Sequence, residues 1–294
     1  MYLQRFADRR DLPGFVALGR RLGFAGVELG HVVEAAALER LAPGEADVPA
    51  VHHPCPALPG GPAAVNLLAP SAMARRHAAD AVLRTLETAL RYGSRVVVLH
   101  LGRAEDAAGE AARRLTFELT SRHAAGQAAT SRCVAVADEL RCTLDAVEAE
   151  WMGPAVDTLG PVAEAAAGAG VRLALETGYA PYELPRPPGM SRLLDELGGS
   201  GLGAWLDTGH VGAQVSLGLA SYQDWSISVA ARWLGAHLHD VVGVRDHLVP
   251  GMGGVDFSAV LGILPADAIL TCEVDWYFTP EEVRAGRARI EALL

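Results

Sequence analysis

Short apolar runs alternate with longer segments of helical spacing along the whole chain, and this alternation limits the fold more than any other feature. Repeated strand–helix units are typical of a parallel sheet, because parallel neighbours need a crossover helix between them. The segment Ala72–Tyr92 shows the helical spacing clearly, with one apolar stripe, outward arginines and Gly93 directly after it. Eight runs are predicted to be strands: Tyr2–Phe6, Ala25–Leu29, Val48–His52, Arg95–His100, Val171–Glu176, Leu202–Asp207, Leu234–His239 and Ala268–Glu273.

Eight strand–helix units in a chain of 294 residues predict an α/β fold of the (β/α)8 TIM barrel type, which typically occupies about 250 residues. Residues 1–294 are therefore expected to form a single barrel domain. The connection from Arg103 to Gly170 is too long for one crossover and is rich in helix formers. We predict a long helical insertion over about residues 104–168, between the fourth and fifth strands, as an extended hairpin or a lengthened helix.

The composition limits the partners and the compartment. Asp and Glu outnumber Lys and Arg by 35 to 25, which gives no positive sign of a nucleic-acid partner, although net charge alone does not exclude one. No apolar run approaches the roughly 18 residues of a membrane span, and the N-terminus lacks a signal-peptide layout. Four irregularly spaced cysteines predict neither a disulfide framework nor a zinc knuckle. The protein is expected to be cytoplasmic, without a membrane partner, and a homo-oligomer is left open.

Ionisable residues stand at the ends of the predicted strands. In a barrel these ends surround one mouth, so side chains that are distant in sequence converge there. Crowded acids would raise one another's pKa values unless a cation compensated them. Carboxylates and imidazoles are the ligands that divalent metals take, so the sequence predicts a metal site at the mouth. The strand-end residues are Glu28, His52, His100, Glu176, Asp207, His237 and Glu273.

Two motifs carry the strongest signals. In "WLDTGH", Asp207 and His210 bracket a two-residue turn that presents both side chains to the mouth. In "AHLHD", strand alternation puts His237 and His239 on the same side. The paired residues of these motifs are therefore candidate ligands.

Three other signals are weaker. The motif "VHHPCP" does not distinguish His52 from His53. The glycine- and proline-bearing stretch "RDHLVPGMGGVDF" can bring His247 over the site, and whether Asp246 reaches it is left open. Glu28 is the weakest of the strand-end candidates.

These motifs resemble the xylose isomerase-like barrels, which include sugar and sugar-phosphate isomerases and epimerases and DNA-repair nucleases of the endonuclease IV type. The resemblance runs in order from about Leu22 to the C-terminus. It implies a barrel with metal-dependent chemistry. The segments that carry it are "GFAGVEL", "VHHP", "RYGSRVVVLHLG", "LALETG", "WLDTGH", "HLHDVVG", "DHLVPGMGGVDF" and "CEVDW" followed by "TPEEV".

In the epimerase branch the resemblance implies one ion, bound by two glutamates, an aspartate and a histidine. The glutamates matching Glu176 and Glu273 then serve as the catalytic acid and base. We expect His210 to act as a catalytic residue that hydrogen-bonds a substrate oxygen. The metal ligands would be Glu176, Asp207, His237 and Glu273, and the residues that bind substrate, including any phosphate or carboxylate, would be His52, His100 and Arg245.

In the nuclease branch the resemblance implies up to three zinc ions. The third is held by two histidines and an aspartate spaced D-x-H from the second histidine. Here Asp246 and His247 are adjacent, and Arg245 occupies the offset position, which puts the third ion in doubt. The additional ligands in this branch would be His52, His100, His210 and His247.

The leading hypothesis is a divalent-metal-dependent isomerase or epimerase that acts on a small sugar or sugar-like hydroxy-carbonyl compound through an enediolate. The first alternative is an endonuclease IV-like multi-zinc phosphodiesterase, and the second is a non-catalytic metal-binding barrel. The cofactor is expected to be one to three ions of zinc, manganese, cobalt or magnesium. The substrate cannot be named, because the loops that set specificity in this fold have no readable shape.

Overall fold

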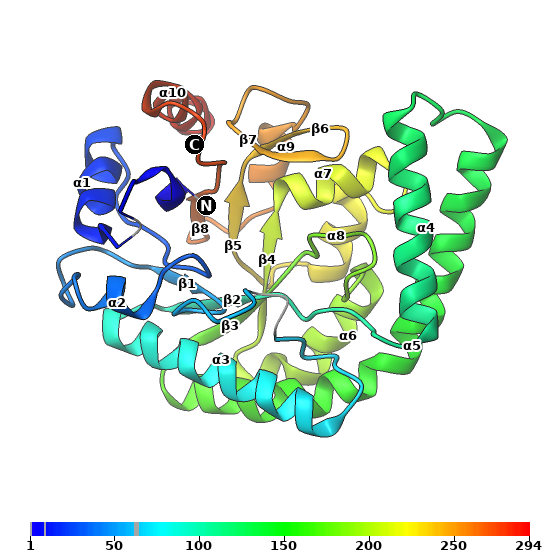
Figure 1. Cartoon of the computed structure of the whole chain (residues 1–294), viewed down its shortest axis with the longest axis horizontal. Coiled ribbons are helices and arrows are strands. Elements are labelled where there is room, and N and C mark those ends of the chain that lie inside the picture. Colours follow the sequence, from blue (N-terminus) through cyan, green and yellow to red (C-terminus); the bar gives the residue numbers. More distant parts are fainter. Residues whose placement is uncertain (1, 9, 62–64) are drawn as a thin grey trace.

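Six parallel strands form one curved sheet that nearly closes into a barrel (Figure 1). The computed structural model describes residues 2–8, 10–61 and 65–294. The strands follow the order β1-β2-β3-β4-β5-β8, and a two-stranded hairpin, β6-β7, lies outside the sheet. The six strands are β1 (Ala50–His52), β2 (Val96–Leu99), β3 (Arg172–Glu176), β4 (Gly203–Asp207), β5 (Trp233–Leu238) and β8 (Ile269–Cys272), and the hairpin is β6 (Asp240–Val242) with β7 (Arg245–Leu248).

The predicted α/β barrel is therefore confirmed, but the first two predicted strands are wrong. The run Tyr2–Phe6 begins with a 3-10 helix, η1 (Tyr2–Arg5), instead of a strand. Its Tyr2 hydroxyl donates a hydrogen bond to the carbonyl of Phe278, and Arg5 contacts the same carbonyl. These contacts hold the segment against the C-terminal part of the chain rather than beside another strand.

The run Ala25–Leu29 lies beside β1 but makes only one isolated bridge, between Leu29 and Val51. The backbone N–H of Val27 donates to the carbonyl of Asp47, and the N–H of His52 donates to the carbonyl of Leu29. Among the described residues the pairing does not extend beyond that bridge. The sheet accordingly has an open seam between this run and β8.

Helices cover the outer face of the sheet (Figure 1). The helix α3 begins after its cap Ser71 and ends at Gly93, whose φ of 70° lets the backbone leave the helix as predicted. Within the described ranges, no helix is both long and apolar enough to cross a membrane. The helices are α1 (Leu12–Leu22), α2 (Ala35–Leu38), α3 (Ala72–Tyr92), α4 (Ala107–Ala124), α5 (Ser131–Gly168), α6 (Pro187–Leu197), η3 (Gly198–Ser200), α7 (Thr208–Ser216), α8 (Tyr222–Val229), α9 (Phe257–Leu261) and α10 (Pro280–Glu291).

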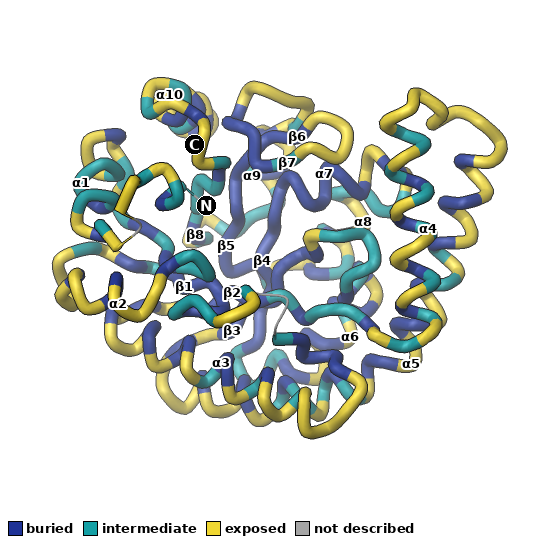
Figure 2. Tube along the Cα trace, in the orientation of Figure 1, coloured by how far each residue is buried: buried dark blue, intermediate teal, exposed yellow. Residues whose placement is uncertain are grey.

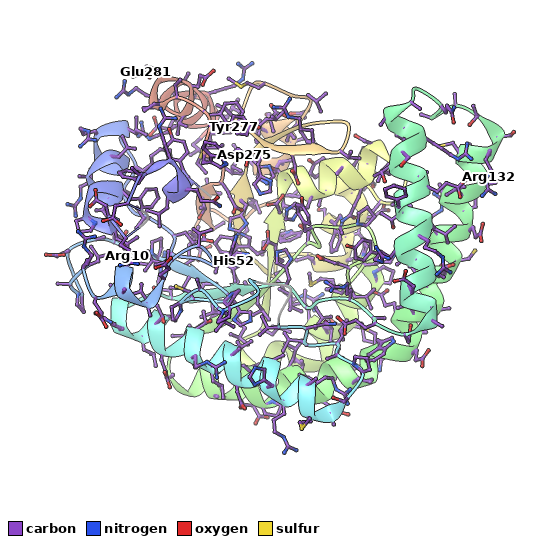
Figure 3. The ribbon with its side chains drawn as sticks, in the orientation of Figure 1. Arg10, His52, Arg132, Asp275, Tyr277 and Glu281 are labelled. Carbon is purple, nitrogen blue, oxygen red and sulfur yellow. The ribbon has the colours of Figure 1, made fainter. Side chains whose placement is uncertain are left out.

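The predicted insertion between the fourth and fifth expected strands is confirmed as a helical hairpin of α4 and α5, between β2 and β3. Its two helices share a small apolar cluster that includes Leu119 and Leu140. Much of the outer surface of the hairpin is exposed, whereas the strands are buried (Figure 2). Arg132 lies near its far end, well away from His52 in the middle of the molecule (Figure 3).

Alternate strand residues belong to two different apolar clusters. Val97 and Leu99 pack with the covering helices, while Val96 and Val98 pack with Trp205 in a separate cluster. The ring of Trp205 lies 5.3 Å from that of His237, so apolar packing supports the polar residues at the strand ends. The sequence pattern of the strands thus builds a rigid base for the site.

Candidate metal centre

Glu176, at the end of β3, is the residue around which the site is organised. Its side chain is only 1 % exposed. Its Oε2 lies 2.8 Å from Nε2 of His52 and 3.3 Å from Nε2 of His100. Its Oε1 lies 2.9 Å from Nδ1 of His237. The two oxygens therefore face two separate groups of histidines.

Four ligand atoms come together on the His237 side of Glu176. Nδ1 of His237 lies 3.1 Å from Oε2 of Glu273 and 3.6 Å from Oδ2 of Asp207. Parallel pairing explains part of this arrangement, since β4 and β5 set Asp207 directly beside His237. Glu176, Asp207, His237 and Glu273 lie close enough to hold one ion, as do Glu176, His52 and His100.

Hydrogen bonds orient two of the imidazoles. Nε2 of His237 lies 2.9 Å from Oε1 of Glu28, whose other oxygen accepts a hydrogen bond from Thr271. Nδ1 of His52 lies 2.7 Å from the carbonyl of His53, which can only accept, so Nδ1 carries the proton. The remaining nitrogen of each ring is left facing Glu176. A histidine ligand is typically held in this way by a carboxylate or carbonyl behind it.

His210 is held similarly at the start of α7. Asp207 caps this helix by accepting a hydrogen bond of 2.7 Å from the backbone N–H of His210. Nδ1 of the ring donates to the carbonyl of Thr177, at 3.0 Å. Nε2 is buried and has no hydrogen-bond partner among the described residues. Such an orphaned acceptor is costly unless a ligand satisfies it.

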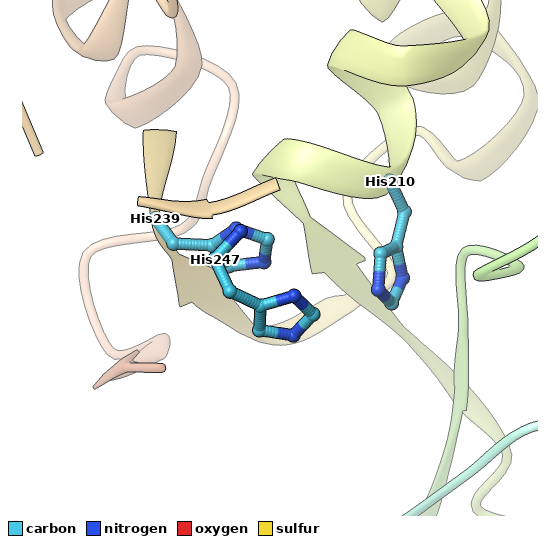
Figure 4. A group of neighbouring side chains, drawn as sticks. All are labelled: His210, His239 and His247. Atoms are coloured by element: carbon cyan, nitrogen blue, oxygen red, sulfur yellow. The ribbon is translucent and has the colours of Figure 1, made fainter. Parts of the chain in front are cut away.

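A third group of possible ligands consists of His210, His239 and His247 (Figure 4). The last two rings stack with centroids 4.3 Å apart. Nδ1 of His239 accepts from the backbone N–H of His247, and Nε2 lies 2.8 Å from Oδ2 of Asp207. Because both nitrogens are used, His239 would have to release Asp207 before it could bind an ion.

The charges of this cluster shift the pKa values of its acids. Burial alone would raise the pKa of Glu176, but the nearby imidazoles of His100 and His237 outweigh burial and hold it well below its usual value. The pKa of Asp207 is also held well below its usual value, since His210 and His239 outweigh the effect of burial. Both acids are therefore carboxylates at neutral pH.

The histidine pKa values diverge. Burial disfavours the charged form of His237, but Glu28 and Glu273 outweigh it and raise the pKa well above the usual value. Burial also opposes the charged form of His247, yet Asp246 and Glu273 raise its pKa to about 9. Burial dominates at His210 and lowers its pKa. His210 is consequently a neutral imidazole at neutral pH.

These residues fit a divalent ion. The carboxylates are ionised, two imidazoles turn an oriented nitrogen toward Glu176, and the buried Nε2 of His210 lacks a partner within the described part of the chain. Mixed carboxylate and imidazole donors suit zinc, manganese and cobalt, and they do not select among them. An ion that binds here would compete with protons for the lone pairs of the imidazoles.

A cavity of about 470 Å³ opens beside the cluster. Glu176, Glu273 and His210 reach it from the cluster, and Tyr179 and Asp275 also line it. In Figure 3, Asp275 lies between His52 and the outer residues Tyr277 and Glu281. A compound the size of a monosaccharide fits this space.

The structure places most of the residues predicted from the sequence in one cluster. Of the two adjacent histidines, His52 contacts Glu176, whereas His53 turns to the hydroxyl of Thr85. Asp246 does reach the site, since its Oδ1 lies 3.0 Å from Nδ1 of His247. The predicted ligands that lie in the cluster are His52, His100, Glu176, Asp207, His210, His237, His247 and Glu273.

Arg245 does not join them. It is exposed on β7, where its guanidinium donates to the hydroxyl of Tyr277, and it does not line the cavity. The β6-β7 hairpin turns alternate residues outward, which separates Arg245 from Asp246. The anion-binding role predicted for Arg245 therefore has no support from the cavity.

Sequence reasoning did not single out several polar lining residues, among them His31, Tyr179 and Glu183. His31 follows the end of the second predicted strand by two residues, so its position could have signalled it. The other two lie in the loop after β3, whose path the sequence does not reveal.

Comparisons with known proteins agree with the barrel. The profile of the family described as xylose isomerase-like TIM barrel matches residues 16–293. A search of curated proteins finds no match.

Solved structures with the same fold include two zinc-containing proteins and an epimerase. The TTHB071 protein from Thermus thermophilus, soaked with zinc chloride, is 22 % identical, with 96 % of this chain and 93 % of that chain covered and a TM-score of 0.57. An L-ribulose 3-epimerase is 18 % identical, with 98 % and 89 % covered and a TM-score of 0.63. An IOLI protein with a bound zinc atom is 15 % identical, with 96 % and 91 % covered and a TM-score of 0.62. At these identities the likeness establishes a shared fold.

Proposed function

The chain belongs to the xylose isomerase-like TIM barrel family, and we propose that it is a divalent-metal-dependent isomerase or epimerase of a small sugar-like hydroxy-carbonyl compound. One observation carries this proposal. Oε1 of Glu176 and Oε2 of Glu273 lie 2.9 and 3.1 Å from Nδ1 of His237, and both residues line the same cavity. An isomerase needs groups that remove a proton from the substrate and return it, and two carboxylates close together beside a cavity can do this.

The cofactor would be held by Glu176, Asp207, His237 and Glu273. When bound there, a divalent ion supplies a Lewis acid that polarises adjacent carbonyl and hydroxyl oxygens and lowers the free energy of an enediolate. Side chains of the protein would then remove the proton from the substrate and return it.

Glu273 is the residue that would receive the proton from carbon. Burial would raise its pKa, but His237 and His247 outweigh it and hold the pKa at about 2, so the side chain is ionised. It is also the most exposed ligand of the four, at 18 %. Glu176 is ionised as well, so it would first take a proton from a substrate hydroxyl or from water and then donate that proton to the carbon.

His210 is suited to bind a substrate hydroxyl. Its Nδ1 proton is committed to the carbonyl of Thr177, and its ring is neutral, so Nε2 can only accept a hydrogen bond. A substrate hydroxyl that donates a hydrogen bond to Nε2 would give this buried nitrogen a partner and would fix the position of the substrate relative to Glu176.

A specific observation favours a second candidate, a multi-zinc phosphodiesterase of the endonuclease IV type. The Oε2 atom of Glu176 faces His52 and His100, which make a second ligand group that shares this carboxylate with the first. An isomerase with a single ion would use those two histidines for the substrate instead. The hydrolase would use two or three ions to activate water and stabilise the leaving oxygen.

Solvent exchange separates the two candidates. The metal-loaded protein is incubated in heavy water with a panel of ketoses, and deuterium at carbon is measured by mass spectrometry. The isomerase incorporates deuterium, and Glu273→Gln abolishes the incorporation, whereas Glu139→Gln on the exposed face of α5 does not. Cleavage of bis(p-nitrophenyl) phosphate without any exchange would favour the hydrolase.

A further inference from the structure

Arg103 is the one permanent cation among the described residues that line the cavity. The chain contains no lysine, so its arginines supply all permanent side-chain positive charge. The other ionisable lining residues are histidines, carboxylates and a tyrosine. A single arginine in a lining rich in carboxylates raises the question of what it binds.

The backbone fixes where Arg103 stands. Asn66 holds it from both sides: its amide donates to the carbonyl of Arg103 at 2.8 Å, and its Oδ1 accepts from the N–H of Arg103 at 3.2 Å. Gly102 has a φ of 114°, and a Cβ there would lie 2.1 Å from Oδ1 of Asn66. The carbonyl of Gly102 also accepts from the N–H of Leu184, in the loop after the neighbouring strand β3. The backbone at Arg103, three residues after His100, is therefore held in a fixed position.

The guanidinium is not committed to a strong partner. Its nearest acid is Glu105, with Nη2 and Oε1 3.5 Å apart. Both side chains are about one-third exposed, at 33 and 38 %. An exposed pair of this kind contributes little, so a ligand can replace Glu105 at small cost.

The acids nearest the reacting position are paired with histidines rather than with Arg103. Glu176 and Glu273 face His237, and Asp246 faces His247. An anionic group of a substrate would be repelled by these carboxylates but attracted by Arg103. The planar guanidinium can bind a phosphate or a carboxylate through two parallel hydrogen bonds.

We propose that Arg103 binds an anionic group, a phosphate or a carboxylate, on a substrate whose reacting carbons lie beside Glu176 and Glu273. This inference rests on the proposed function and narrows its substrate class from sugar-like compounds to their acidic derivatives. Arg103, rather than Arg245, supplies the charge for recognition.

Calorimetry with three probes tests this role on the metal-loaded protein. The probes are fructose 6-phosphate, glucuronate and fructose, which separate phosphate, carboxylate and neutral ligands. We expect at least one anionic probe to bind more tightly than fructose. Arg103→Ala should lower the affinity for that probe by about ten- to a hundredfold, the usual contribution of a charge-assisted hydrogen-bonding pair. The affinity for fructose should stay unchanged.

Three further variants make the test specific. Arg103→Lys should restore part of the preference, because the charge returns without the planar fork. Glu105→Gln should leave the preference intact or increase it, whereas a merely structural Arg103–Glu105 pair predicts that Glu105→Gln behaves like Arg103→Ala. Arg113→Ala removes an equivalent arginine from the exposed pair with Glu110 and should change nothing.

The proposal is overturned if the wild-type protein shows no preference for either anionic probe, if Arg103→Ala retains it, or if Arg245→Ala removes it instead. The metal content and the deuterium exchange of each variant are measured in parallel. If Arg103→Ala loses the preference for anions but keeps its metal content and its deuterium exchange, the result supports the role of Arg103. If the wild-type protein itself binds no metal or shows no exchange, the proposed function fails.

Discussion

Nδ1 of His237 lies 2.9 Å from Oε1 of Glu176, and both side chains are almost entirely buried, at 0 and 1 % exposure. The pair joins β5 to β3 across the mouth of the barrel. Their pKa values move apart, upward for the histidine and downward for the glutamate, so the pair is ionic in the metal-free protein. A divalent ion would displace the proton between them.

Glu176→Gln should therefore destabilise the metal-free protein. The variant removes a charged acceptor from His237 and His52, and the loss of such a bond costs about 2 kcal/mol. Urea unfolding at pH 6 with a chelator measures the change. The matched variant Glu139→Gln, on an exposed helix face, should stay within about 0.5 kcal/mol of wild type. Equal stabilities of the two variants would contradict the pairing.

The adjacent histidines provide a second test. His52→Asn should reduce metal affinity or turnover, because His52 contacts Glu176. His53→Asn should leave both unchanged and lower only the stability, since His53 bonds to the hydroxyl of Thr85. Chelator competition and thermal unfolding distinguish these effects. The assignment is wrong if His53→Asn is the variant that loses metal.

Glu28→Gln tests the residue behind His237. The substitution keeps a hydrogen-bond acceptor for Nε2 but removes the negative charge that raises the pKa of His237. Loss of a carboxylate behind a metal-binding histidine lowers metal affinity by about 10- to 100-fold. Competition with a chromophoric chelator should show this weakening, while the number of ions bound at saturation stays the same. A change in that number would make Glu28 a direct ligand instead.

The metal-free protein should lose stability as the pH rises from about 6.5 to about 9. The pKa of His247 is raised from its ordinary value of 6.5 to about 9, so in this range the folded state keeps a proton that the unfolded chain has released. That contribution is complete below pH 6.5 and is lost through the folded pKa. Glu273 acts at the other end, because its contribution disappears as the pH falls toward its pKa of about 2.

Thermal unfolding across this range, with chelator and with zinc, measures the effect. The stabilisation by zinc should grow with pH, since binding must displace protons from the imidazoles. His247→Gln should flatten the decline of the chelated protein. A melting temperature that stays constant or rises from pH 6.5 to pH 9 in chelator would contradict the assignment.

The sequence was sufficient to predict the barrel and most of the cluster for a geometric reason. Parallel strands end at one mouth, so listing strand-end residues also lists neighbours such as Glu176, Asp207 and His237. The same logic found the insertion, because no crossover needs the nearly seventy residues between Arg103 and Gly170.

The failures also have physical causes. An apolar run such as Tyr2–Phe6 satisfies a strand pattern, yet its hydrogen bonds to Phe278 depend on tertiary contacts that a pattern does not contain. The sequence motif points to Arg245 as the candidate for binding an anion and does not single out Arg103. The outward turn of the β6-β7 hairpin and the hydrogen bonds from Asn66 decide which arginine lines the cavity.

Metal content per chain tests the central claim most directly. The protein, purified without chelator, is exposed to zinc or manganese, freed of excess ion and measured by elemental analysis beside Glu176→Gln and Glu139→Gln. The account predicts about one or more tightly held ions per chain in wild type and Glu139→Gln, and their loss in Glu176→Gln. A wild-type chain that retains no ion, or a Glu176→Gln variant that retains the full complement, would contradict it.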